Sequence, residues 1–378
     1  MDKLAEIEDL TLRYYTYEGV VKALEKVRLV IKPGETLGIV GETGSGKSVT
    51  ALALMGIVIP PGKIEGGNIR VFMDGGFIEV TRADENTLQR LRGRVVAMIF
   101  QEPSQALNPV YTIEDQIGEA YLTHMFADIY GQALKEVEEE IAEKPSSIIL
   151  GIERLILRRF LKNRRDRLAN LLGKLPLLRS YRRRVRRIVR NMVVEILRQM
   201  EIPDPERVAS SYPHQLSGGM KQRAVIAMAL ACRPTILIAD EPTTSLDVTI
   251  EAQILELMRT LKERYNATLL FITHDFGLIA EMAERVAVMY AGSVVEVADV
   301  LGIFTKPLHP YTQALLKAIP KIGVRELTPI EGSIPNLINP PAGCRFHPRC
   351  PYAFDKCRQV QPQLVHVGEG RLVACHLY

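Results

Sequence analysis

The chain has 378 residues, of which 47% are hydrophobic and 24% charged, so it can bury a full-sized core and divide into two or three domains. Its longest uncharged apolar stretch, residues 48–62, is too short to cross a bilayer, and residues 1–10 lack the apolar core of a secretory signal. These features exclude membrane-spanning and secreted proteins, and we expect a folded, soluble, cytoplasmic protein. The net charge of +4 is uneven, because residues 153–198 carry 16 Lys and Arg but three Asp and Glu.

Residues 36–48, TLGIVGETGSGKS, predict a buried strand, a glycine-rich turn and a helix that begins near Lys47. This order is the context that the phosphate-loop motif G-x-x-x-x-G-K-[ST] requires. The glycines let the backbone curl so that its N–H groups point at phosphate oxygens, and the helix N-terminus adds a favourable dipole. Lys47 is expected to reach the β- and γ-phosphates, and the Ser48 hydroxyl to bind Mg²⁺. The predicted nucleotide-binding residues of this segment are Gly41, Glu42, Thr43, Gly44, Ser45, Gly46, Lys47, Ser48 and Thr50.

A long helical segment separates Gln101 from Ser217, with 115 residues between them. Within it, residues 126–198 combine an acidic stretch, EEEIAEK, with apolar residues at helical spacing and a run of arginines. The pattern predicts helices with basic faces, broken near Pro176.

The stretch QLSGGMKQR, residues 215–223, follows this segment. Ser217, Gly218 and Gly219 are expected to open a helix whose free N–H groups form an anion site without a lysine. The alternative is an ordinary helix N-cap with no ligand.

An acidic pair follows the apolar strand in TILIADEPTTSLD, residues 235–247. Ligands of open α/β sheets bind at the carboxyl ends of strands, where Asp240 and Glu241 stand. We expect Asp240 to hold Mg²⁺ through water and Glu241 to orient and polarise the attacking water. Gln101 and His274 also follow apolar strands, and the Gln101 carboxamide can bind Mg²⁺ or the attacking water.

The order of these motifs resembles the nucleotide-binding subunit of ATP-binding cassette (ABC) proteins over about residues 4–300. The resemblance implies an α/β fold, in which a phosphate-loop ATPase core carries an inserted α-helical subdomain. The expected core comprises residues 1–101 and 231–300, and the subdomain residues 102–230 with an extra basic insert at about 126–198. Residues 301–378 form a C-terminal extension.

The family resemblance also implies roles for single residues. His274 contacts the γ-phosphate, and Tyr14 stacks on adenine, with Tyr15 and Tyr17 as alternatives. Two elements are expected to act on ATP across a dimer interface: the loop at Asp247, and the LSGGM sequence, which closes on the γ-phosphate of ATP held by the partner. The residues of that signature are Leu216, Ser217, Gly218, Gly219 and Met220.

The extension, with IFTKPLHPYTQALLKAIP and PPAGCRFHPRCPYAFDKC, is similar to that of subunits energising dipeptide and oligopeptide importers, of the type named first in their operons. This resemblance implies ATP-driven peptide uptake at the cytoplasmic face of the membrane. The implied partners are a second, related ATPase subunit, two permease subunits and an external solute-binding protein. Import of oligosaccharides or nickel is the alternative, and a soluble ABC ATPase without a transport role is a weaker one.

The basic insert has two interpretations. It is either a solvated arm or a surface that contacts anionic lipid headgroups, where each nearby Lys or Arg contributes about 1 kcal/mol. Nucleic-acid binding has no aromatic or motif support in the sequence.

Four of the five cysteines lie in the last 35 residues, at Cys344, Cys350, Cys357 and Cys375, whereas Cys232 is expected in a helix core. A reducing cytoplasm disfavours disulfides, and structural zinc sites usually use closer C-x₂₋₄-C pairs. The wide spacing suits an iron–sulfur cluster, and the importer resemblance implies a [4Fe-4S] cluster at these four residues, with Zn²⁺ and free or paired thiols as the alternatives.

Overall fold

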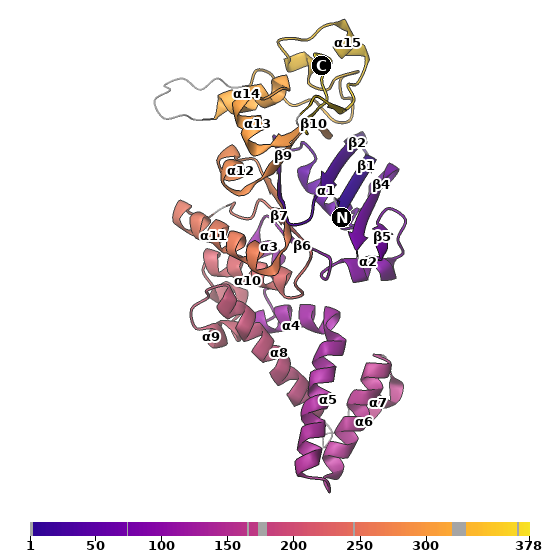
Figure 1. Ribbon diagram of the computed structural model, residues 1–378, viewed down its shortest axis with the longest axis vertical. Coiled ribbons are helices and arrows are strands. Elements are labelled where there is room, and N and C mark those ends of the chain that lie inside the picture. The colour runs from indigo at the N-terminus through magenta and orange to yellow at the C-terminus, as the bar shows by residue number, and fades with distance from the viewer. Residues whose placement is uncertain are drawn as a thin grey trace. The chain divides into compact units, whose positions relative to one another are not determined.

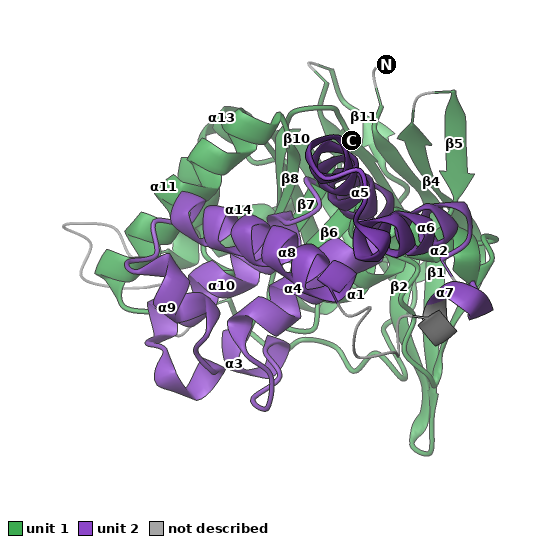
Figure 2. Ribbon diagram, turned by 90° about the horizontal axis from the view of Figure 1, so that it is seen from below, with its two compact units in different colours: residues 1–101, 234–378 green, residues 102–233 purple. Residues whose placement is uncertain are grey.

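The structure is a computed structural model. It describes residues 3–73, 75–164, 166–172, 180–244, 246–319, 330–368 and 370–378. The chain divides into two compact units, coloured separately in Figure 2. The first comprises Met1–Gln101 and Pro234–Tyr378, and the second Glu102–Arg233.

The first unit contains a four-stranded antiparallel sheet in the order β2-β1-β4-β5. Its strands are β1 (Ala5–Thr16), β2 (Gly19–Ile31), β4 (Gly62–Met73) and β5 (Gly76–Glu79). From Val27 to Ile31 of β2, buried residues alternate with exposed or partly buried ones, as expected for a sheet that is covered on one face.

The second sheet has eight strands in the order β11-β12-β10-β9-β3-β8-β7-β6, and β9, β3, β8, β7 and β6 run parallel. The strands are β3 (Thr36–Val40), β6 (Val96–Ile99), β7 (Ile236–Asp240), β8 (Thr268–Thr273), β9 (Arg285–Tyr290), β10 (Ser293–Asp299), β11 (Val365–His366) and β12 (Leu372–Val373). Every residue of β3, β6, β7 and β8 is buried, which is why these segments read as continuous apolar runs.

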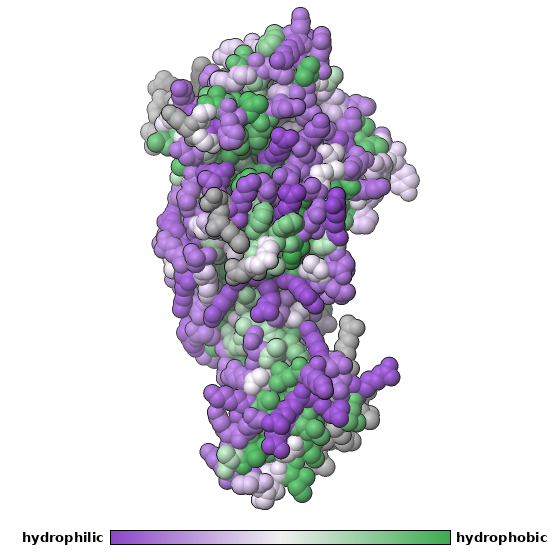
Figure 3. Space-filling view, turned by 45° about the vertical axis from the view of Figure 1, so that its right-hand side comes forward, coloured by the Kyte–Doolittle hydropathy of each residue, from purple (hydrophilic) through white to green (hydrophobic). Residues whose placement is uncertain are grey.

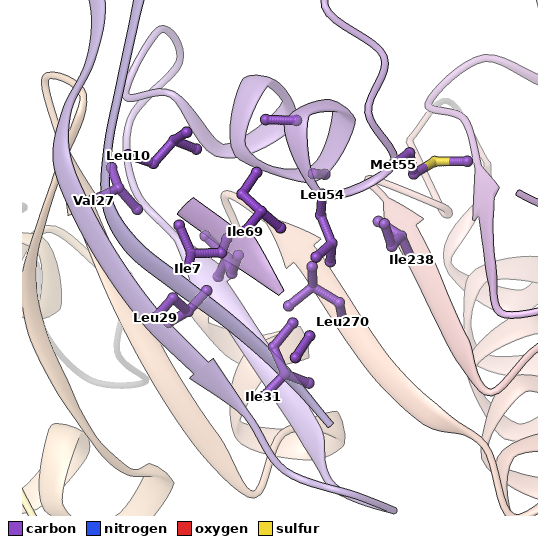
Figure 4. Close-up of a cluster of buried hydrophobic side chains, with 14 of the residues drawn as sticks. Ile7, Leu10, Val27, Leu29, Ile31, Leu54, Met55, Ile69, Ile238 and Leu270 are labelled. Atoms are coloured by element: carbon purple, nitrogen blue, oxygen red, sulfur yellow. The ribbon is translucent and has the colours of Figure 1, made fainter. Parts of the chain in front are cut away.

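The core of this unit lies between the two sheets (Figure 4). Ile7, Leu29 and Ile69 of the antiparallel sheet face Leu54 of α1 and Leu270 of β8. The helices of the unit are α1 (Lys47–Leu54), α2 (Glu85–Leu91), α11 (Val248–Tyr265), α12 (Phe276–Met282), α13 (Val300–Thr305), α14 (Pro310–Ala318), η3 (His347–Arg349) and α15 (Asp355–Gln359). A parallel sheet flanked by helices and an antiparallel sheet confirms the predicted α/β fold class.

The C-terminal extension packs within the first unit (Figure 1). Strand β12 pairs with β10 of the large sheet. Arg345 is 7% exposed, pairs with Glu25 of β2 and donates to the Ala291 carbonyl. Phe346 is buried against Tyr290 and Tyr311, with ring centroids 5.2 and 5.3 Å away. The extension therefore joins the core of the ATPase unit through both backbone pairing and side-chain burial.

The described part of the second unit is helical. Its elements are α3 (Pro103–Ala106), α4 (Ile113–His124), α5 (Phe126–Glu143), α6 (Ile148–Lys162), α7 (Arg167–Leu172), α8 (Ser180–Gln199), α9 (Pro205–Ala209), η2 (Pro213–Gln215) and α10 (Gly218–Leu230). Helix α4 begins at a capping box formed by Thr112 and Asp115. The break expected near Pro176 lies outside the described residues.

The arginine run of α8 is paired with carboxylates from other helices. Arg184 donates to Glu140 at 2.7 and 3.0 Å, to Glu136 at 3.2 Å and to Glu153 at 3.1 Å. The Arg184 side chain is 10% exposed and that of Glu153 is 2% exposed, so this pair is withdrawn from water, whereas Glu136 and Glu140 are 28% and 48% exposed. Arg187 also pairs with Glu136. The acidic stretch of α5 thus neutralises part of the basic charge of α8.

Hydrophilic side chains dominate the face of the molecule in Figure 3, with smaller apolar areas among them. Apolar side chains reach the surface at the lower end of that view, where Figure 1 places α5 and α6. Ile148, Ile149 and Leu155 of α6 are 78%, 49% and 47% exposed. Among the described residues, no helix is both long and apolar enough to span a membrane.

Candidate functional site

The predicted catalytic motifs follow strands that end at one edge of the large sheet. Val40 of β3 is in register with Thr273 of β8, Asp240 of β7 with Ile272 of β8, and Ile99 of β6 with Ala239. Since these strands are parallel and adjacent, the segments after them emerge side by side. The phosphate loop follows β3, Glu241 follows β7, His274 follows β8 and Gln101 comes two residues after β6.

The phosphate loop needs glycine at two positions. A Cβ atom at Gly41 would collide with the backbone carbonyl of Met289 on β9. Gly46 has φ +101° and is the N-cap of α1, and a Cβ atom there would lie 2.8 Å from the Leu24 side chain. The loop is therefore held between β9 and β2 in a conformation that other residues adopt only with strain.

The other loop residues differ in burial. Thr43 and Gly44 are exposed, Glu42 and Ser48 are partly buried, and Ser45 and Thr50 are buried. The Thr50 hydroxyl donates to the Gly46 carbonyl at 2.9 Å, closing the first turn of α1.

Lys47 is 6% exposed, and its ammonium group donates to the carbonyls of Gly41 and Glu42 at 2.8 and 3.2 Å. Burial lowers the pKa of Lys47, although the carboxylates of Glu241 and Asp240 oppose this effect. Burial, together with the nearby Glu241 carboxylate, raises the pKa of Asp240, while the Ser48 hydroxyl and Lys47 favour its charged form. A lysine and an aspartate withdrawn from water in this way are suited to bind a phosphate and a cation.

Glu241 lies at the centre of a hydrogen-bonded group. Its carboxylate accepts from the Gln101 carboxamide at 3.0 Å and from the Thr244 hydroxyl at 3.1 Å, and its Oε1 lies 3.1 Å from Nδ1 of His274. The Glu241 backbone has φ +47°, an uncommon conformation for a residue with a side chain, and its N–H donates to the Ile272 carbonyl at 2.8 Å. The structure thus brings together Glu241, Gln101 and His274, three residues that the sequence separates widely.

Thr244 was not among the predicted site residues. It stands in the EPTTSLD stretch, three residues after Glu241. A hydroxyl at that spacing could have indicated a hydrogen bond to the Glu241 carboxylate. Asp247, in the same stretch, is the N-cap of α11 and accepts from the Ile250 N–H at 3.0 Å.

The LSGGM signature lies in the second unit. Ser217 is the N-cap of α10, and its hydroxyl accepts from the Met220 N–H at 3.3 Å. Leu216 is buried at 9% exposure, and Gly218 and Gly219 form the first turn of the helix.

The three tyrosines considered for adenine differ in environment. Tyr14 is partly buried and packs against the core cluster, and burial raises its pKa. Tyr15 is 48% exposed and donates to Glu65, and Tyr17 is fully exposed at the β1–β2 turn.

The predicted iron–sulfur cluster is wrong. Cys344, Cys350, Cys357 and Cys375 are free thiols that line one cavity of about 10 Å³, room for roughly one water molecule and far too small for four irons and four sulfides. Among the described residues, no group of three or more His, Cys, Asp or Glu side chains can hold a metal ion. The same finding leaves the zinc alternative without a ligand set.

Burial changes the acidity of three of these thiols. Burial raises the pKa of Cys344 to about 11, and it also raises the pKa values of Cys350 and Cys375. Thiolates are the form that binds metal, and burial in this apolar setting favours the neutral thiols. Phe346 and His309 line the same cavity as the four thiols.

Comparison with known proteins assigns the family. Residues 24–244 match the family model described as "ABC transporter", which spans more than half of the chain. The chain belongs to the ABC transporter ATPase family. As a member of this family, it is an ATPase whose nucleotide chemistry uses ATP and Mg²⁺.

Further matches cover the C-terminal region and the whole chain. Residues 295–357 match the model "Oligopeptide/dipeptide transporter, C-terminal region". The dipeptide transport ATP-binding protein DppD of Haemophilus influenzae is 40% identical over 99% of this chain and 95% of its own length. The oligopeptide transport ATP-binding protein AppD of Bacillus subtilis is 40% identical over 100% of this chain and 98% of its own.

A solved structure supports the same assignment. The dimeric structure of MJ0796, a bacterial ABC transporter cassette, is 25% identical with a TM-score of 0.54, and the match covers 78% of this chain and 98% of that one.

Proposed function

We propose that this ABC ATPase is the ATP-hydrolysing subunit of an importer for dipeptides or oligopeptides. The observation that carries the proposal is the likeness to dipeptide and oligopeptide transport ATP-binding proteins, which extends through the C-terminal extension at 40% identity. The alternatives are import of oligosaccharides or nickel by the same machinery and, less favoured, a soluble ATPase without a transport role.

In the proposed site, the loop of residues 41–48 and Thr50 hold the phosphates, with Lys47 at the β- and γ-phosphates and Tyr14 at the base. Ser48, Gln101 and Asp240 would hold Mg²⁺. Their oxygens are of the kind that this ion prefers, and the Ser48 hydroxyl favours the charged form of Asp240 by lowering its pKa. Bound Mg²⁺ would neutralise charge on the phosphates.

Glu241 is proposed to orient the attacking water and accept its proton. Its contacts with Gln101, Thr244 and His274 hold the carboxylate in one orientation. A water bound to this carboxylate would therefore always be placed in the same position. His274, with 60% of its side chain exposed, is free to reach a γ-phosphate through its other ring nitrogen.

Hydrolysis is proposed to need a second, related ATPase subunit as a heterodimer. The signature residues 216–220 and Asp247 of one subunit would act on ATP bound to the phosphate loop of the other. The α10 N-terminus supports this proposal, because helix N–H groups favour an anion. The remaining proposed partners are two permease subunits and an external solute-binding protein. Binding to the permease subunits would hold the protein at the cytoplasmic face of the membrane.

Uptake measurements test this function. A strain that lacks this chain is expected to lose uptake of labelled dipeptides and oligopeptides, and the chain is expected to co-purify with two multi-span membrane subunits. The isolated chain is expected to hydrolyse ATP slowly. Normal peptide uptake without the chain, together with lost uptake of an oligosaccharide or nickel, would move the assignment to that substrate. Full ATPase activity in a strictly monomeric preparation would contradict the two-subunit site.

A further inference from the structure

The phosphate loop of this protein carries an acidic residue, Glu42, at the place where a polyanion binds. Glu42 follows Gly41 directly, and its backbone carbonyl accepts from the Lys47 ammonium group. The Glu42 carboxylate also acts electrostatically on Lys47. An uncompensated carboxylate in this loop would repel the phosphates of ATP and weaken the effect of Lys47.

Arg349 of the extension compensates this charge. Its Nη1 lies 2.9 Å from Oε2 of Glu42, and its Nη2 lies 3.2 Å from Oε1, so the guanidinium binds both carboxylate oxygens. The Arg349 side chain is 5% exposed and that of Glu42 is 25% exposed. A bidentate ion pair that is this well shielded from water is stronger than an ion pair on the surface.

Contacts with the rest of the unit fix the position of Arg349. Its Nε donates to the Glu331 carbonyl at 2.9 Å, and its Nη1 donates to the Tyr290 hydroxyl at 3.3 Å. Burial alone would lower the pKa of Arg349, but its bonds to Glu42 and Tyr290 raise it overall. The arginine therefore stays charged and aimed at the loop.

Tyr311 of α14 holds the backbone of the same residue. Its hydroxyl accepts from the Glu42 N–H at 3.0 Å, and the side chain is fully buried against Tyr290, with ring centroids 4.5 Å apart. Side-chain and main-chain groups of Glu42 are thus both bound by residues more than 250 positions later in the chain.

We propose that Arg349 is a positioning and charge-compensating residue of the ATP site, acting through Glu42. The C-terminal extension is then part of the machinery that sets ATP affinity, although it lies far in sequence from every nucleotide motif. The proposal rests on ATP binding at the phosphate loop and adds a residue to it.

The test measures ATP affinity of the full chain, with a fluorescent ATP analogue and ATP in competition. Arg349→Ala is expected to raise the dissociation constant about tenfold, since it leaves one negative charge beside the phosphates. The double variant Arg349→Ala with Glu42→Gln is expected to return to within about threefold of the parent, because the repelling charge is gone. A purely structural role for Arg349 predicts no such rescue.

Arg371→Ala is the matched control. Arg371 is also a buried arginine of the extension, paired with Glu296 at 3.3 Å, and neither residue contacts the phosphate loop in the described structure. ATP affinity of this variant is expected to equal that of the parent, with thermal unfolding of all variants recorded. If Arg371→Ala lost as much ATP affinity as Arg349→Ala, the effect would come from general destabilisation of the extension and not from the contact with Glu42.

Glu42→Gln alone keeps the proposal testable if Arg349→Ala does not fold. It removes only negative charge and is expected to bind ATP at least as tightly as the parent. Weaker binding by Glu42→Gln, parent-like binding by Arg349→Ala, or an unrescued double variant would each overturn the proposal. A parent chain that binds no ATP would instead refute the proposed function.

Discussion

The nucleotide site of the first unit and the arginine-rich helices of the second unit both bring charged side chains together, but by different means. In the first, Glu241 and His274 each follow directly from the end of a buried strand, so the sheet register sets their positions. In the second, Arg184 meets glutamates that lie 31 to 48 residues earlier in the chain. This difference shows that the position of a short motif after a strand can be predicted from the sequence. The residues that a run of charges will pair with cannot.

The largest expected effect concerns Glu241 in the nucleotide site. Glu241→Gln is expected to reduce ATP turnover of the assembled transporter by about 100-fold or more, because an amide cannot accept the proton of the attacking water. ATP affinity is expected to stay near that of the parent, since the carboxylate is proposed to act on water. Steady-state hydrolysis and equilibrium nucleotide binding measure the two quantities.

Lys47→Ala is the contrasting control, because loss of the phosphate-binding ammonium group is expected to weaken ATP binding itself. Thr244→Ala, which removes one hydrogen bond to Glu241, is expected to fall between the parent and Glu241→Gln in turnover. Hydrolysis at the parent rate by Glu241→Gln would show that another group positions the water.

The second expected effect concerns stability of the helical unit. Arg184→Ala is expected to lower the free energy of unfolding by about 3 kcal/mol, because it leaves the buried Glu153 carboxylate without its cation. Arg183→Ala, at an exposed position of the same helix, is expected to change it by less than about 0.5 kcal/mol. Chemical unfolding of both variants measures the difference. Equal stability of the two variants would contradict the network.

The pH dependence sharpens this test. The hydrogen bond from Arg184 holds the pKa of Glu140 below its ordinary value of 4.5. A carboxyl group whose pKa is lowered by folding stabilises the protein above its unfolded pKa, and this contribution is lost as pH falls through the folded value. The difference between parent and Arg184→Ala is therefore expected to shrink as pH falls below about 4.5. An unchanged difference at pH 3 would exclude the Glu140 contribution.

The smallest expected effect concerns the proposed contact of the basic insert with anionic membranes. Reversing the charges of Arg182, Arg183, Arg186 and Arg187 is expected to weaken binding to anionic liposomes modestly, and less at high salt, because exposed charges are screened by ions. Nucleotide affinity is expected to stay unchanged.

Two double variants, matched in charge, test whether the ion pairs of α8 weaken its contact with the membrane. Arg186 and Arg187 already pair with Glu114 and Glu136, so reversing these two is expected to matter less than reversing Arg182 and Arg183. Liposome binding equal to that of the parent in both double variants would leave the solvated arm as the remaining interpretation.

The cysteines show where reasoning from spacing failed. Clustering in the sequence correctly predicted that four cysteines lie close together in space, since one cavity is lined by Cys344, Cys350, Cys357 and Cys375. Spacing carries no information on the volume that neighbouring side chains leave between the sulfur atoms, and that volume is too small for the predicted cluster. The choice between a metal site and packed thiols depends on burial, which only the folded chain decides.

The sequence by itself determined the α/β fold class, the ATPase family and the positions of the motifs along the chain. It did so because glycine positions, strand-ending carboxylates and helix caps act on the few residues around them. Tertiary structure alone decided which distant charges meet. Glu42 receives Arg349 from 307 residues away, and Glu153 receives Arg184 from 31 residues away. The physical reason is that an ion pair depends on distance and burial in space, and the packing of separate elements sets both.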